Sequence, residues 1–293
     1  MSVACSRSRA TVSTGVARSP WGSLIATPTR ASPTSMPMRT PRRGVRSAVP
    51  FSGTELALDR GQGVLDLGGV LTAALGEVVL AASAAALVRK QRDFVSQHGS
   101  LAQITSTKSS PVDPVTAVDK ASEVHIVDRL AELRPDDGIL GEEGANTEGT
   151  TGVTWVVDPI DGTVNFIYGL PMYAVSVGAA VDGEIVAGAV VNVASGEIYR
   201  AALGGGAWVT RGGEEMRLWA SRAEDTSTAL VATGFSYNSQ WRAAQAEILH
   251  RVLPRVRDIR RMGSAALDLC QLAEGRVDAY YEHGTHPWDY AAG

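Results

Sequence analysis

Two aspartates, Asp158 and Asp161, follow a run of apolar residues, and Pro159 lies between them. The apolar run predicts a buried strand. Pro159 predicts a stiff turn directly after it, because proline fixes φ and has no N–H to donate. Such a turn would hold the two carboxylates close together, where they repel each other unless a cation lies between them. Mg²⁺ prefers oxygen ligands of this kind and keeps waters that a phosphate can replace. Since Gly162 and Thr163 could offer backbone N–H groups at a helix start, the stretch predicts a metal-dependent phosphate site.

Other acidic residues occupy similar places, at predicted turns beside apolar strands. They are Asp113 and Asp119, Glu142 and Glu143, and Asp289. A single carboxylate at the surface is usually only solvated, but several such segments beside apolar strands favour a shared metal site. Two alternatives stay open at this point. Asp119 could cap a helix as well as, or instead of, serving the site, and Glu143 could be solvated or support a neighbouring ligand.

The elements that would position these acids come in blocks rather than in strict alternation. Helical periodicity predicts helices over residues 63–96, 118–133, 241–252 and 264–274. Between and after these helices, the residue patterns predict strands at 139–140, 174–181, 184–193, 197–202, 207–209, 230–234, 257–261 and 277–281. Asp182-Gly183 predicts a tight hairpin turn, and Ser264 is expected to cap the last helix. The order of elements indicates an α+β fold built from layers.

Charge is distributed unevenly, although the formal net charge is only −4. Residues 1–50 contain eight arginines and no Asp, Glu or Lys, so the rest carries 19 basic against 31 acidic side chains, a net charge of −12. An acidic globular part does not favour nucleic acid as a partner. Residues 1–60 are predicted to be a disordered Arg-, Ser- and Pro-rich extension. They resemble a transit peptide, or they are an upstream stretch outside the native protein.

The cysteines and the hydropathy of the chain bear on two further properties, disulfide bonding and membrane insertion. Cys5 and Cys270 have no plausible partners, so no disulfide is predicted and Cys270 is expected to be a small buried hydrophobic residue. No run of about 18 apolar residues occurs, so we predict no membrane-spanning helix and expect a cytoplasmic protein.

Four segments together resemble the inositol monophosphatase family in sequence, order and spacing: residues 109–113, 141–144, 155–166 and 288–293. Residues 260–268 and 279–282 resemble its inositol monophosphatase branch, with actinobacterial detail. The resemblance covers about residues 65–293 and implies one domain over 61–293 with a layered α/β/α/β/α sandwich. It also implies Mg²⁺-dependent hydrolysis of a phosphate monoester by a metal-activated water, with inositol-1-phosphate as the leading substrate.

The resemblance also implies a role for particular residues of this chain. The metal ligands would be Glu142, Asp158, the carbonyl of Ile160, Asp161 and Asp289. The catalytic residues would be Thr163, Asp119 and Glu142. The substrate contacts would be Asp161, Gly162, Thr163, Ala265, Glu282 and Lys108, although Lys108 could also be an ordinary surface lysine.

The chain departs from the family pattern in one respect, because it ends at Gly293 directly after the last motif, where family members continue. We therefore expect a fragment that lacks the C-terminal elements of the fold. Other functions stay open: a phosphatase for histidinol phosphate, a nucleotide bisphosphate or fructose bisphosphate, an inactive fragment, or a non-catalytic interaction protein, since some family members act with transcription or RNA machinery. By resemblance alone, a homodimer is expected.

Overall fold

The computed structural model describes residues 17–18, 24–25, 67–98, 105–108 and 114–293. Most of the extension predicted to be disordered lies outside the described residues, as does the motif at 109–113 with Asp113. Within the extension, β1 (Ala17–Arg18) pairs antiparallel with β2 (Leu24–Ile25).

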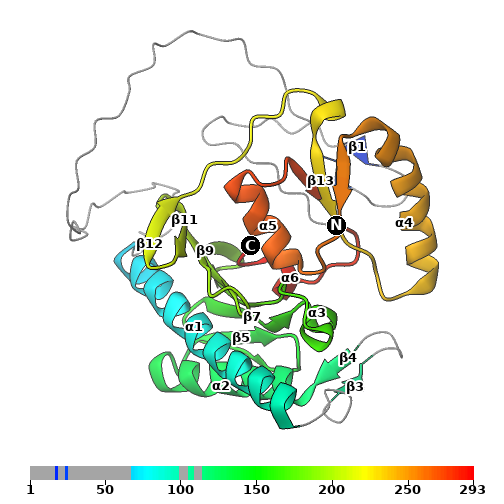
Figure 1. The fold of residues 1–293 in the computed structure, drawn as a ribbon. Helices are drawn as coiled ribbons and strands as arrows, with labels where there is room; N and C mark the ends of the chain where they lie inside the picture. Colours follow the sequence, from blue (N-terminus) through cyan, green and yellow to red (C-terminus); the bar gives the residue numbers. More distant parts are fainter. Residues whose placement is uncertain (1–16, 19–23, 26–66, 99–104, 109–113) are drawn as a thin grey trace.

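An eight-stranded sheet with the order β12-β11-β10-β9-β8-β7-β5-β6 forms the centre of the fold (Figure 1). Its neighbouring strands are antiparallel except β5 and β7, which are parallel. Asp182 and Gly183 form the predicted hairpin turn, both with positive φ, which a two-residue turn of this kind requires. The strands are β5 (Gly138–Gly141), β6 (Asn146–Thr147), β7 (Val153–Asp161), β8 (Ala174–Val181), β9 (Glu184–Asn192), β10 (Ile198–Ala202), β11 (Gly206–Arg211) and β12 (Glu214–Arg217).

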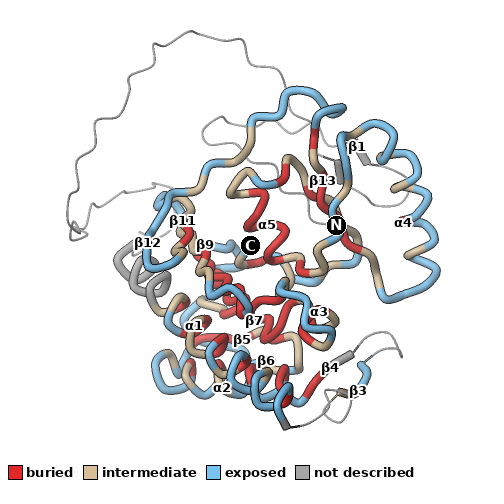
Figure 2. The backbone as a smooth tube through the Cα atoms, in the orientation of Figure 1, coloured by how far each residue is buried: buried red, intermediate tan, exposed pale blue. Residues whose placement is uncertain are grey.

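Two helices, α1 (Leu67–His98) and α2 (Ala117–Leu133), cover one face of this sheet (Figure 1). Both were predicted to within four residues at each end. The largest apolar cluster lies between these helices and the sheet, and Figure 2 shows it as the buried centre of the molecule. Burial of this apolar surface is the main stabilising term for the layer.

A second, smaller sheet lies on the other side of the large one, and α5 (Ala265–Glu274) packs between the two. Residues of α5 contribute to two apolar clusters, one against the large sheet and one against the small sheet. The small sheet is parallel, with the order β14 (Asp258–Arg260), β13 (Leu230–Thr233) and β15 (Ala279–Tyr281). Helix α4 (Ser239–Val252) lies outermost (Figure 1), so the predicted succession of α and β layers is confirmed.

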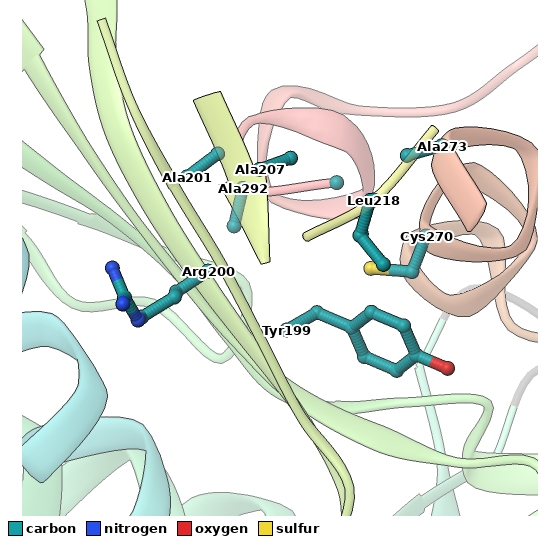
Figure 3. Close-up of a pocket in the computed structure, with 9 residues that line it drawn as sticks. Tyr199, Arg200, Ala201, Ala207, Leu218, Cys270, Ala273 and Ala292 are labelled. Carbon is teal, nitrogen blue, oxygen red and sulfur yellow. The ribbon is translucent and has the colours of Figure 1, made fainter. Parts of the chain in front are cut away.

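Cys270 of α5 is buried beside a small pocket of about 30 Å³ between α5 and strands β10 and β11 (Figure 3). Tyr199 and Leu218 share the lining, and burial raises the pKa of the Cys270 thiol above its ordinary value. The prediction that Cys270 is a buried hydrophobic residue is therefore confirmed.

Two paired glycines shape the face of the large sheet that the last helix, α6 (Pro287–Tyr290), covers. Gly178 of β8 and Gly188 of β9 are register partners. A Cβ atom at Gly188 would lie 2.6 Å from Cα of Ala292, and one at Gly178 would lie 3.2 Å from Cβ of Ala291. The chain after α6 therefore rests directly on the sheet, which fixes the end of α6. Among the described residues, no helix has the length and apolar character to cross a bilayer.

Candidate metal and phosphate site

Asp158 and Asp161 lie within the last four residues of β7 rather than after the strand, so the prediction of a turn at Pro159 was wrong. The strand continues to Asp161, and its pairing with β8 shifts register between Asp158 and Asp161. Proline disrupts a ladder because it has no N–H, and it is tolerated where a bulge interrupts the pairing. The N–H of Ile160 instead donates to the Asp158 carboxylate at 3.0 Å. The bulge, not a turn, brings the two carboxylates to the end of the sheet.

The N-terminus of α5 holds the carboxylate of Asp161. Ser264 caps α5, as predicted, by accepting a hydrogen bond from the N–H of Leu267. The Ser264 hydroxyl also donates to Asp161 at 2.6 Å, and the N–H of Ala266 donates to the same oxygen at 2.7 Å. Ala265, a predicted substrate contact, lies between these two donors. Asp161 therefore joins the central strand of the large sheet to the helix between the sheets.

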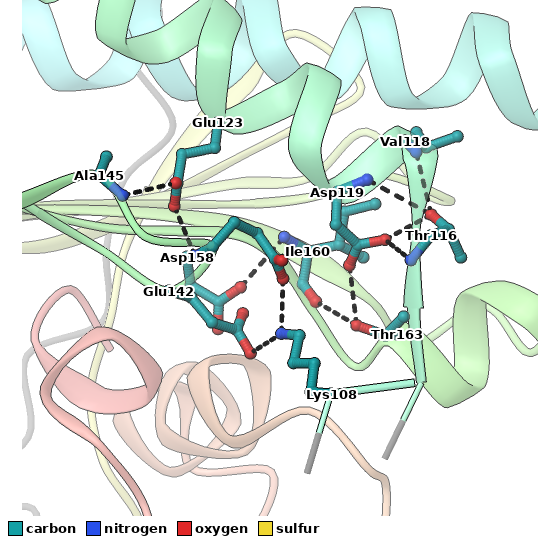
Figure 4. A network of polar contacts seen from close by, with 11 residues as sticks. Lys108, Thr116, Val118, Asp119, Glu123, Glu142, Ala145, Asp158, Ile160 and Thr163 are labelled. Carbon is teal, nitrogen blue, oxygen red and sulfur yellow. Dashed lines mark hydrogen bonds and ion pairs between the residues drawn. The ribbon is translucent and has the colours of Figure 1, made fainter. Parts of the chain in front are cut away.

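Asp119 caps α2 and also contacts Thr163, another residue of the candidate site. It is the N3 residue of a capping box with Thr116 at the start of α2, and it accepts hydrogen bonds from the Thr116 N–H and hydroxyl. It also accepts a hydrogen bond from the hydroxyl of Thr163 at 2.9 Å. The Thr163 hydroxyl lies 3.1 Å from the Ile160 carbonyl oxygen as well (Figure 4). Thr163 begins α3 (Thr163–Tyr168), as the predicted helix start requires.

Glu142 and Glu143 follow β5 and pair with one lysine. Lys108 Nζ lies 2.7 Å from Glu142 Oε1 and 2.5 Å from Glu143 Oε1. Burial alone would lower the pKa of Lys108, but the two carboxylates raise it above its ordinary value. Lys108 follows the short strand β3 (Thr105–Thr107), which pairs with β4 (Pro114–Thr116). The structure therefore places the ammonium group of Lys108 against these two acids, although the residue as a whole is exposed.

Asp289 lies in α6, and Glu282 directly follows β15 of the small sheet. Both carboxylates lie near the other acids. Asp289 accepts a hydrogen bond from the N–H of His286 at 2.6 Å. Glu282 follows β15 and accepts a hydrogen bond from the hydroxyl of Tyr280 at 2.7 Å. Its carboxylate lies so close to Gly234 that a Cβ there would be 1.9 Å from Glu282 Oε2. Only a glycine at that position leaves room for Glu282.

The acids are close enough to change one another's protonation. Burial, followed by repulsion from Glu142, Asp161 and Asp289, raises the pKa of Asp158 well above its ordinary value. Burial also raises the pKa of Asp161 to about 7, against the hydrogen bonds from Ser264 and Ala266, and that of Asp289 to about 8, with added repulsion from Asp161. Carboxyls from three distant segments therefore lie in one low-dielectric region.

Comparison with known proteins shows which family this chain resembles in sequence and structure. Residues 69–293 match the model of the inositol monophosphatase family. The inositol-1-monophosphatase SuhB of Mycobacterium tuberculosis is 54% identical over 224 residues, which cover 73% of this chain and 77% of that protein. The solved structure of Mycobacterium tuberculosis SuhB superimposes with a TM-score of 0.66 at 49% identity, covering 76% of this chain and 82% of that one. The Nus factor SuhB of Escherichia coli is 38% identical over 192 residues, 65% of this chain and 70% of that protein.

This chain belongs to the inositol monophosphatase family. It is therefore a phosphatase by family.

The donor set of this inositol monophosphatase site fits a hard cation. The second carboxylate oxygen of Glu142, Oε2, is buried and has no hydrogen-bond donor among the described residues. Among the described residues, no three His, Cys, Asp or Glu side chains converge on a single point, because several of the acids are turned toward protein donors. An unpartnered buried carboxylate oxygen beside raised-pKa acids is what Mg²⁺, with its preference for oxygen ligands, would satisfy.

Sequence reasoning missed several residues that hold the inositol monophosphatase site together. Glu123 of α2 accepts hydrogen bonds from the N–H groups of Glu143 and Ala145. Ser122 donates to the carbonyl of Pro159 at 3.2 Å. Their only signal was spacing, since both lie on the same helical face as Asp119.

Proposed function

We propose that this protein hydrolyses inositol-1-phosphate to inositol and phosphate with bound Mg²⁺. The observation that carries the proposal is that Glu142, Asp158, Asp161 and Asp289 lie near enough to one another for their charges to raise the pKa values of Asp158 and Asp289, with the Thr163–Asp119 hydrogen bond beside them. The substrate is suggested by the relatives, several of which are named inositol-1-monophosphatases.

The metal would be held by oxygen atoms of residues in this region, whose side chains would turn toward a common point. The proposed ligands are Glu142, Asp158, the Ile160 carbonyl, Asp161 and Asp289. Oε2 of Glu142 supports this choice, because a buried carboxylate oxygen without a donor is costly unless it meets a cation. Bound Mg²⁺ would lower the pKa of a coordinated water and stabilise charge on the leaving oxygen.

The attacking water would be oriented by Thr163. The Thr163 hydroxyl already donates its proton to Asp119, so its oxygen is free to accept a hydrogen bond from a water. Burial raises the pKa of Asp119, although three hydrogen bonds act in the opposite direction. The carboxylate is therefore a stronger base, which suits it to accept the proton of the Thr163 hydroxyl. The N–H groups of Gly162 and Thr163 would hold the phosphate. Gly162 suits this place because its φ of 91° is left-handed, and a side chain there would crowd Met172 and Gly263.

The alcohol side of the substrate would face Glu282 and Ala265. Glu282 could accept hydrogen bonds from inositol hydroxyls, and it stands apart from the sheet that carries the other acids. Lys108 pairs with Glu142 and Glu143, so its substrate contact stays a prediction and would be made from beside these carboxylates. A domain over 61–293, a homodimer and a cytoplasmic location are further parts of the proposal; the dimer is tested by measuring mass in solution.

A panel of phosphate esters with measured release of phosphate tests the function. We expect the highest kcat/KM on inositol-1-phosphate and no release when Mg²⁺ is chelated. The panel includes histidinol phosphate, fructose 1,6-bisphosphate and an adenosine bisphosphate. Activity on histidinol phosphate with none on inositol-1-phosphate would overturn the substrate. No activity on any ester, with Mg²⁺ still bound, would instead favour the non-catalytic reading that the name of the Escherichia coli relative suggests.

A further inference from the structure

One face of α2 carries three buried polar residues: Asp119, Ser122 and Glu123. Residues spaced by three and four positions lie together on a helix, so the three side chains point the same way. Asp119 bonds Thr163, Ser122 bonds the carbonyl of Pro159 in the β7 bulge, and Glu123 bonds the segment after Glu142. Figure 4 shows Asp119 and Glu123 on either side of the acids. A single helix thus contacts the site at Thr163, at Pro159 and in the segment after Glu142.

Glu123 differs from the other two because its carboxylate accepts two hydrogen bonds, both from backbone N–H groups of one segment. Its side chain is 5% exposed. Oε2 accepts a hydrogen bond from the N–H of Glu143 at 2.8 Å, and Oε1 accepts one from the N–H of Ala145 at 2.9 Å. No Lys, Arg or His of the described residues forms an ion pair with it. Two N–H bonds to an ionised carboxylate are strong bonds, and here they are what compensates the buried charge.

These two bonds fix the segment that carries Glu142. Glu142 lies directly before one bonded N–H, and its own N–H donates to the carbonyl of Val157 in β7. Gly141 on the other side leaves space for Glu123, since a Cβ there would be 2.3 Å from Glu123 Oε2. The backbone of Glu142 is therefore held on both sides, by α2 and by the strand that carries Asp158.

We propose that Glu123 is a positioning residue that aims the carboxylate of Glu142 at Asp158 and so sets the affinity of the site for Mg²⁺. The inference rests on the proposed function, because it takes Glu142 to be a metal ligand. Glu123 itself contacts neither metal nor substrate. It acts because a carboxylate can accept from both N–H groups at once, whereas any neutral replacement loses at least one of these bonds.

The test is Glu123→Gln, studied in the full chain. One end of the amide would present N–H groups to a backbone N–H, so one bond is lost while the side-chain volume stays the same. We expect the dissociation constant for Mg²⁺, measured by titration calorimetry, to rise about 10- to 100-fold, the usual effect of removing an outer-shell partner. Glu132→Gln is the matched control, since Glu132 is an exposed glutamate on the same helix. It should leave the dissociation constant unchanged.

A purely structural role predicts a different result. Glu123→Gln would then lower the melting temperature of the metal-free protein but leave the Mg²⁺ dissociation constant at the wild-type value, and this outcome would overturn the inference. If Glu123→Gln does not fold, Glu123→Asp serves instead, because it keeps the buried charge and only shortens the reach to the two N–H groups. Its dissociation constant should also rise, and an unchanged value would overturn the inference. Wild-type protein that binds no Mg²⁺ would show that the proposed function, not this inference, is wrong.

Discussion

The two sheets support the site in different ways. β7, which carries Asp158 and Asp161, has a neighbour on each side in the eight-stranded sheet and is covered by α2. β15, which leads to Glu282, is an edge strand of three and pairs only with β13 in the described part of the chain. In the proposed function, the phosphate would therefore be bound beside an interior strand and the alcohol beside an edge strand. If so, catalysis and substrate choice should respond separately to substitutions, because each would depend on a different sheet.

Asp158→Asn tests the chemistry of the large sheet and should have the largest effect. The amide keeps the shape but not the charge, so a metal loses a ligand in the most buried part of the site. We expect kcat/KM to fall by about 10⁴-fold or more, and the rise in melting temperature on adding Mg²⁺ to disappear. Asp182→Asn, the same change in the exposed hairpin of the same sheet, should alter neither. Retained activity in Asp158→Asn would mean that Asp158 of the large sheet takes no part in catalysis.

Glu77→Gln tests whether the large-sheet layer carries an unpaired charge in its core. Glu77 of α1 is fully buried, neither carboxylate oxygen has a hydrogen-bond partner among the described residues, and burial raises its pKa from 4.5 to about 8. An acid with a raised folded-state pKa contributes stability that is present below 4.5 and lost as pH rises through 8. Glutamine carries no charge at any pH. We therefore expect Glu77→Gln to equal the wild type in free energy of unfolding near pH 4.5 and to exceed it by about 5 kcal/mol at pH 9.

Urea unfolding of both proteins at the two pH values measures this difference. The metal-site acids titrate in both proteins, so their contribution cancels in the comparison. Glu184→Gln, at an exposed end of β9, should show no such pH dependence. A difference that does not change between pH 4.5 and pH 9 would mean that Glu77 stays ionised in the folded state.

Thr163→Val separates metal binding from catalysis on the large-sheet side. Valine has the same shape but cannot donate to Asp119 or orient a water. We expect kcat to fall about 100-fold, as for loss of a general acid–base relay, while the Mg²⁺ dissociation constant stays within about twofold of wild type. Steady-state kinetics and calorimetry measure the two quantities, and Thr147→Val in the exposed β6 strand is the control. A large loss of Mg²⁺ affinity would show that Thr163 supports the metal instead.

Local residue chemistry made most of the fold predictable. The cap at Ser264 and the Asp182-Gly183 hairpin are signals carried by one or a few neighbouring residues, and both were confirmed. β12 was missed because its side chains are exposed and mostly charged, so no apolar alternation marks it. The helix α6 was missed because its four residues are too few for a periodic pattern.

The site was less predictable where long-range contacts decide the geometry. Pro159 suggested a turn, but β8 holds the chain in a strand across the proline, and pairing partners are not visible locally. Glu123 contacts a segment about 20 residues away, and nothing in its own neighbours distinguishes it from a surface glutamate on α2. The acids themselves could be chosen from the sequence because the family motif marks them. The residues that aim them could not, because their roles depend on tertiary contacts.

Glu282→Gln tests the small-sheet side and should have the smallest effect on the reaction. Glu282 is far from the Thr163–Asp119 pair in sequence and follows an edge strand, and its carboxylate is held by Tyr280 rather than by the large sheet. If it recognises the alcohol, the amide keeps one acceptor and loses the charge, so KM for inositol-1-phosphate should rise about 10-fold with kcat within about threefold. The Mg²⁺-induced rise in melting temperature should stay at the wild-type value, because the proposed ligands are untouched. If kcat fell as far as in Thr163→Val, the two sheets would share the chemistry, and the separation between catalysis and substrate choice would fail.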